Sequence, residues 1–113
     1  MATEDEVETT IYDLAEQFQQ VAPQYRSMLP SRRTVQADIT DLDRSWHAKW
    51  NYGELSDIKE GELGNRPDIR VQLTSEDLVA LASGELDFRR AWSQNRIRLD
   101  ASMTDLLRLR AFL

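Results

Sequence analysis

The 113-residue sequence predicts one α+β domain, in which an antiparallel or mixed sheet carries helices over one face. Some stretches repeat apolar residues every three or four positions, which is typical of amphipathic helices, and others alternate apolar with polar residues, which is typical of strands. Their order is helix, several strands, two short helices, strand and helix. The length fits a single hydrophobic core.

The N-terminal stretch, about 5–23, predicts an amphipathic helix. Apolar residues from Val7 to Ala22 fall within one arc of the helical projection. Acidic residues crowd the start, where they favour the positive end of the helix dipole. Pro23 is expected in the last turn or just beyond it.

Two strands are expected next, at about 34–40 and 45–52, forming an antiparallel hairpin. Their alternation places Trp46 and Trp50 on one face and His47 on the other, more exposed face. Residues 53–67 fit either a short third strand or a helical turn.

The second half continues with helices whose ends carry clear signals. Thr74, Asp87 and Ser102 stand where N-caps are needed, and Gly84 suits a helix end. The expected elements are a strand at about 68–73, helices at about 75–83 and 87–94, a strand at about 96–101 and a last helix at about 103–113.

Composition excludes several classes of protein. With no cysteine, the chain has neither a disulfide framework nor a thiolate zinc site. A net charge of −6 disfavours binding to nucleic acid or to an anionic membrane by electrostatics alone. The longest apolar run, Leu78–Ala82, is far shorter than the roughly 20 residues of a membrane span. The acidic N-terminus is unlike a targeting segment, so no integral membrane contact and a cytoplasmic location are expected.

The polar residues predict no catalytic or metal site. His47 is the only histidine and has no second imidazole or thiolate for zinc. The carboxylates that invite an acid–base interpretation all stand near helix starts, where capping explains them. They are Glu76, Asp77, Asp87 and Asp105.

One stretch resembles a known family. Residues 68–87, DIRVQLTSEDLVALASGELD, look like the core signature of the sterol carrier protein (type two) family. In that family a strand enters a capped helix, a glycine ends the helix, and an acidic-to-apolar turn starts a second one. The similarity is close over 68–113 and extends to 7–52 only as a compatible order of elements.

The resemblance implies a five-stranded, mostly antiparallel sheet with an apolar tunnel between sheet and helices. The tunnel would hold a fatty acyl chain, an acyl ester or a sterol, with no cofactor and no catalytic residue. On this interpretation the tunnel is lined by Trp46, Trp50, Val71, Leu78, Leu81, Phe88, Trp92, Leu99, Met103, Leu106 and Leu107.

The sequence leaves several alternatives open. The same apolar residues fit a filled core as well as a pocket. Arg110 interrupts the apolar arc of the last helix, so it either snorkels to water or meets the carboxylate of a bound fatty acid. The apolar surface also fits a protein-interaction or dimerisation module, and a homodimer or an association with a lipid-metabolising enzyme is a further expectation. A small isomerase or dehydratase barrel would need a His/Asp or Tyr/Asp pair inside a cavity.

Overall fold

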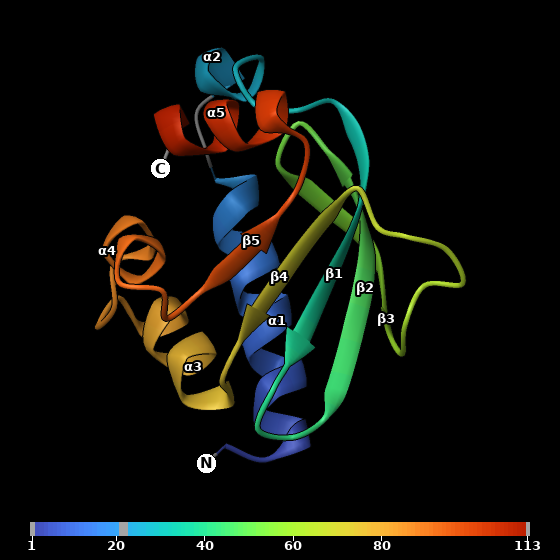
Figure 1. The fold of residues 1–113 in the computed structure, drawn as a ribbon, viewed down its shortest axis with the longest axis vertical. Coiled ribbons are helices and arrows are strands. Elements are labelled where there is room, and N and C mark those ends of the chain that lie inside the picture. The colour runs from blue at the N-terminus through green and yellow to red at the C-terminus, as the bar shows by residue number, and fades with distance from the viewer. Residues whose placement is uncertain (1, 21–22, 113) are drawn as a thin grey trace.

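The computed structural model describes residues 2–20 and 23–112 (Figure 1). The elements in chain order are α1 (Glu4–Gln19), α2 (Pro23–Arg26), β1 (Arg32–Ile39), β2 (Arg44–Asn51), β3 (Glu54–Glu60), β4 (Ile69–Leu73), α3 (Ser75–Ser83), α4 (Phe88–Ser93), β5 (Arg98–Asp100) and α5 (Met103–Phe112).

The strands form one mixed sheet in the order β3-β2-β1-β4-β5. The central pair, β1 and β4, is parallel, with Ala37 opposite Val71, and the other three pairs are antiparallel. Helices lie along one face of the sheet, with α1 crossing behind it and α5 near one end (Figure 1). The predicted α+β class with a mostly antiparallel, five-stranded sheet is confirmed.

The stretch at 53–67 contains the third strand. β3 pairs with β2 across a tight turn in which Tyr52 and Gly53 both have positive φ, 51° and 89°. A side chain at Gly53 would also approach Leu29 Cδ1 to 2.7 Å, so glycine is required there. Asp57 has a positive φ as well, and the register shifts between His47 and Lys49. This irregularity breaks the alternation by which a strand is recognised in a sequence.

Two predicted elements are shorter in the structure. α1 ends at Gln19 rather than at about 23, and Pro23 begins α2, since proline is tolerated in the first turn of a helix. β5 begins at Arg98 rather than at about 96, because the amides of Arg96 and Ile97 donate to the carbonyl of Ala91. Residues 21–22 and 113, which the predicted helices include, lie outside the described residues.

The predicted helix caps are present. The Thr74 hydroxyl accepts from the Asp77 amide, and the Asp87 carboxylate accepts from the Arg90 amide. The amide of Asp105 donates to the Ser102 hydroxyl at 3.2 Å. Gly84 ends α3 in the left-handed conformation.

Candidate functional site

The helix-covered face of the sheet holds an apolar layer made of two clusters of buried side chains. The larger one, here called the Trp46 cluster, consists of Val7, Ile39, Trp46, Leu73, Leu78, Leu86, Ala91 and Ile97. The smaller one, here called the Trp50 cluster, consists of Leu29, Trp50, Ile69 and Leu109. Val71 packs against both clusters, so the two form one continuous layer.

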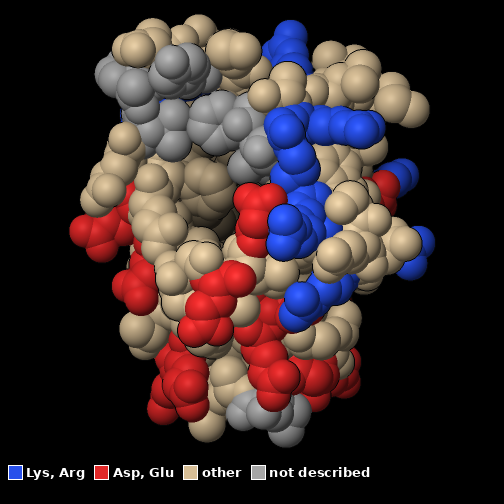
Figure 2. Space-filling view, turned by 90° about the vertical axis from the view of Figure 1, so that its left-hand side faces the viewer, with Lys and Arg blue, Asp and Glu red and all other residues tan. Residues whose placement is uncertain are grey.

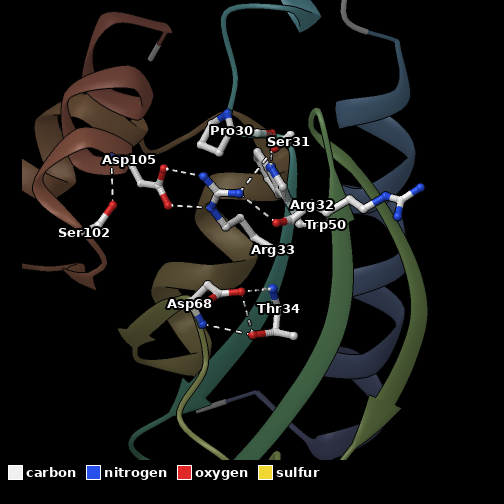
Figure 3. Close-up of polar contacts among 9 residues, drawn as sticks. All are labelled: Pro30, Ser31, Arg32, Arg33, Thr34, Trp50, Asp68, Ser102 and Asp105. Carbon is white, nitrogen blue, oxygen red and sulfur yellow. Dashed lines mark hydrogen bonds and ion pairs between the residues drawn. The ribbon is translucent and has the colours of Figure 1, made fainter.

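The two indole N–H groups of this layer differ. Trp50 Nε1 donates to the carbonyl of Pro30 at 2.9 Å (Figure 3). Trp46, only 1% exposed, has no hydrogen-bond partner for its Nε1 among the described residues. A buried donor without an acceptor costs about 1–3 kcal/mol. The Trp46 cluster therefore contains an unused donor that faces apolar neighbours.

An ion pair attaches α5 to the sheet beside the Trp50 cluster. Arg33 Nε and Nη2 donate to the two carboxylate oxygens of Asp105, at 2.8 and 3.2 Å (Figure 3). The side chain of Asp105 is 4% exposed and that of Arg33 28%. The hydrogen bond with Asp105 raises the pKa of Arg33. The Ser102 cap fixes the position of Asp105 at the start of α5.

This ion pair sets which face of α5 points inward. Asp105 and Leu109 are buried and four residues apart, on one side of the helix. Met103 and Leu107 consequently lie on the outer side, 72% and 61% exposed. Their predicted place in the tunnel lining is wrong, because α5 packs on the sheet through Asp105 and Leu109, which turns these two side chains outward.

The remaining predicted lining residues lie in or near the apolar layer. Leu78 belongs to the Trp46 cluster, and Leu81 and Phe88 pack against it. Leu99 packs against the Trp50 cluster. The rings of Phe88 and Trp92 contact each other edge to face, with centroids 6.4 Å apart.

The last two residues of α5 with a predicted role in ligand binding are Leu106 and Arg110. Leu106 is half-buried, whereas Arg110 is exposed. The Arg110 carbonyl accepts a hydrogen bond from Arg89 Nη2 of α4 at 3.2 Å. The Arg110 side chain therefore extends to the solvent, which is the snorkelling alternative.

The opposite face of the sheet is polar. Asp38 accepts hydrogen bonds from Gln36, Ser45, Arg70 and Gln72 at 2.6–3.2 Å. Burial disfavours the charged carboxylate, but these four bonds outweigh it and lower the pKa of Asp38 to about 2. All the accepting capacity of this carboxylate is used internally, so the network is structural.

His47 lies on this polar face, as predicted. Its Nδ1 is 2.8 Å from the carbonyl of Gly61. Within residues 2–20 and 23–112, no group of three or more histidine, aspartate or glutamate residues is arranged to hold a metal ion. No helix in the same part of the chain is long and apolar enough to span a membrane.

Two hollows open on the surface. One, of about 490 Å³, lies beside the Asp38 network and is lined by polar residues, among them Arg44 and Glu60. The other, of about 530 Å³, lies between α1 and β3, with Tyr12, Leu55 and Ile58 on its walls. The second hollow borders the apolar layer, because Leu55 packs against the Trp50 cluster and Ile58 against the Trp46 cluster.

Sequence reasoning missed the buried ion pairs. Besides Arg33–Asp105, Arg96 pairs with Asp77, whose side chain is 12% exposed. Both carboxylates stand in first turns of helices, where an exposed capping role explains them sufficiently. The only signal in the sequence was that each leads into an apolar helix, where a charge that faces inward needs a partner.

Comparison with known proteins agrees with this fold. The model of the SCP-2 sterol transfer family matches residues 13–113. No curated protein sequence is significantly similar to the chain.

Among solved structures, sterol carrier protein 2-like 2 from Aedes aegypti superimposes with a TM-score of 0.66. It is 21% identical, and the match covers 96% of each chain. The sterol carrier protein domain 2 of Helicoverpa armigera gives a TM-score of 0.67 at 18% identity, covering 97% of this chain and 88% of that one.

A third similar structure is the stereoselective sec-alkylsulfatase Pisa1 from Pseudomonas sp. The TM-score is 0.56 at 24% identity, over 79% of this chain. This chain spans only 14% of the length of that enzyme. The match of the family model over nearly the whole chain, with the mixed sheet and its covering helices, shows that this protein belongs to the SCP-2 sterol transfer family.

Proposed function

We propose that this protein binds one lipid, a fatty acyl chain or a sterol, in the apolar layer between sheet and helices, and carries it without covalent chemistry. Family membership supports the proposal, and the sterol carrier protein-2 of Aedes aegypti has been solved in complex with palmitate. The observation that carries it is the way α5 covers the Trp50 cluster, with two inward side chains, Asp105 and Leu109.

α5 is the element best suited to admit a ligand. The close backbone contacts of the helices are those of α1 with α3 and with β3. α5 is attached mainly by side chains: the Arg33–Asp105 pair, Leu109 and the bond from Arg89. A small outward movement of α5 would expose the Trp50 cluster and leave the rest of the layer in place.

Burial of the apolar surface of such a ligand gives enough free energy for binding. Burial of about 300 Å² of acyl chain gives several kcal/mol at roughly 25 cal/mol per Å², before the cost of association. The unpartnered indole N–H of Trp46 supplies one polar group that a carbonyl or hydroxyl oxygen of the ligand would satisfy. The proposal therefore favours lipids with such an oxygen over plain hydrocarbons.

The test is titration of the purified protein with a fluorescent fatty acid and a fluorescent sterol. We expect saturable, one-to-one binding of at least one of them by a folded monomer. The absence of saturable binding to both would reject the carrier function. Native mass spectrometry of protein purified from its own source would identify the lipid.

Two other functions compete with this proposal. The exposed Met103 and Leu107 favour a dimerisation module as the second candidate, which sedimentation would reveal as a ligand-free oligomer. The similarity to a part of an alkylsulfatase also makes an association with an enzyme a candidate, testable by co-purification. An isomerase of the barrel type lacks support, because His47 lies on the polar face, away from the apolar layer.

A further inference from the structure

We propose that the outer face of α4 and α5 docks on an anionic lipid surface, and that the carrier meets its donor and acceptor membranes through this face. The proposal rests on the proposed lipid-carrier function and adds the place of contact. The surface in question, here called the α4–α5 face, is formed by the exposed arginines and the exposed large apolar side chains of these two helices: Arg89, Arg90, Met103, Leu107, Arg108 and Arg110.

The arginines of this face are free to meet an external anion. All four are exposed, and none has an acidic ion-pair partner within residues 2–20 and 23–112. Arginines elsewhere are often neutralised: Arg44, Arg70 and Arg96, for example, each pair with a carboxylate. The α4–α5 face therefore concentrates positive charge that nothing in the described structure compensates.

The charges of the molecule are separated in space. Figure 2 looks at the side on which α3, α4 and α5 lie in Figure 1, and shows basic side chains in the upper right part and acidic ones below. The first turn of α1, which carries Glu4, Asp5 and Glu6, is at the lower end of the molecule in Figure 1. The net charge of −6 is the sum over both regions. On that sum alone, binding to an anionic membrane was disfavoured. α4 and α5 themselves carry four arginines and one carboxylate, Asp105, which is paired with Arg33.

The same face carries exposed apolar side chains. Met103 and Leu107 are four residues apart, and Arg110 follows after three more, so the three form one stripe along α5. Large apolar side chains among arginines on a helix face are typical of segments that lie in a lipid interface. A soluble partner of negative charge alone would leave Met103 and Leu107 without a role.

Contacts within the structure hold α5 with this face towards the solvent and connect it to α4. The Arg33–Asp105 pair and Leu109 hold the opposite side of α5 against the sheet. The hydrogen bond from Arg89 to the Arg110 carbonyl connects α4 with α5. Docking would therefore bring the membrane against the element that covers the Trp50 cluster, which is the element proposed to open for the lipid.

The experiment is co-sedimentation with vesicles of phosphatidylcholine, with or without phosphatidylglycerol. We expect binding to the anionic vesicles only, weakening as salt is raised. The triple variant R89Q/R90Q/R108Q should lower the affinity at least about tenfold, since each arginine near an anionic surface is worth about fivefold. The variant M103S/L107S should lower it as well while leaving the salt dependence in place.

The matched control is R32Q/K59Q/R98Q, which removes the same charge from exposed residues outside the α4–α5 face. Equal losses in both triple variants, or no binding of the unmodified protein to anionic vesicles, would overturn the proposal. So would a result in which M103S/L107S abolishes self-association, measured by sedimentation, because the face would then be a dimer interface. Fluorescent fatty acid binding in free solution should be unchanged in M103S/L107S and in the control variant, so a failed carrier function is recognised separately.

Discussion

The guanidinium of Arg33 on β1 and the carboxylate of Asp105 on α5 form a two-point ion pair between residues 72 positions apart in the chain. The pair lies beside Trp50 (Figure 3) and one turn from Leu109, which both belong to the Trp50 cluster. It is therefore the polar contact that determines how firmly α5 covers the apolar layer.

Asp105→Asn should loosen α5. Breaking a fully buried ion pair costs about 3–5 kcal/mol, and because Arg33 remains partly exposed we expect about 1–2 kcal/mol here. Urea denaturation measures this loss of unfolding free energy. The matched control is Asp100→Asn, whose exposed pair with Arg66 spans 3.6 Å and should cost less than about 0.5 kcal/mol. Equal losses in the two variants would show that Arg33–Asp105 does not anchor the helix.

Most of the fold was predictable because local signals and packing agree. The Thr74 and Asp87 caps, the Gly84 helix end and the Trp46–Trp50 strand face each follow from a few neighbouring residues, and the structure has all of them. The family signature then supplied the sheet size, which local patterns alone left open. β3 was ambiguous because its positive-φ residue at Asp57 interrupts the alternation.

The orientation of α5 was not predictable in the same way. The local pattern predicts the arc with Met103, Leu106 and Leu107 as the inward face, whereas the structure buries Leu109. The inward face is decided by Asp105, whose partner Arg33 comes from a distant strand. A local pattern contains no information on that partner, and the exposure of Met103 and Leu107 follows from it.

Asp38 should make stability depend on pH in the acid range. Its folded-state pKa of about 2 is below the usual aspartate value of 3.8, so its contribution is complete above about pH 4 and is lost as the pH falls towards 2. Asp38→Asn should remove about 1 kcal/mol at neutral pH, after allowance for partial solvent screening, and should flatten this part of the profile. Urea denaturation of both proteins between neutral pH and pH 2 measures it. An unchanged pH profile in the variant would assign the acid sensitivity to another carboxylate.

Trp46→Phe and Trp50→Phe should differ although the two residues share one strand face. Trp50→Phe removes the indole hydrogen bond to the Pro30 carbonyl, which keeps only the Tyr52 amide as a donor. It should therefore cost about 0.5–1.5 kcal/mol more than Trp46→Phe, which removes an unpartnered donor. Chemical denaturation gives the difference. Trp46→Phe should also weaken binding of a fatty alcohol more than binding of an alkane of equal length. If it weakens both equally, the indole N–H does not contact the ligand.

His47→Ala should leave ligand affinity unchanged, because the ring lies on the polar face of the sheet, opposite the apolar layer. The loss of its contact with the Gly61 carbonyl should lower stability by about 0.5–1.5 kcal/mol. Fatty acid titration and urea denaturation measure the two effects. A large loss of affinity at unchanged stability would place the ligand on the polar face instead.

Arg110→Gln tests whether this exposed arginine reaches the ligand as well as the solvent. Its backbone carbonyl is held by Arg89, but no described residue holds its guanidinium, so the side chain is free to turn towards the edge of α5. A contact with a fatty acid carboxylate would be worth about 1.5–3 kcal/mol. The variant should then bind palmitate at least about tenfold more weakly while binding methyl palmitate unchanged, since tenfold corresponds to about 1.4 kcal/mol. Arg108→Gln, which removes the same charge two residues away, is the control. Equal affinities of the variant and the unmodified protein for both ligands would show that Arg110 does not contact the bound fatty acid. Its only proposed role would then be in the α4–α5 face.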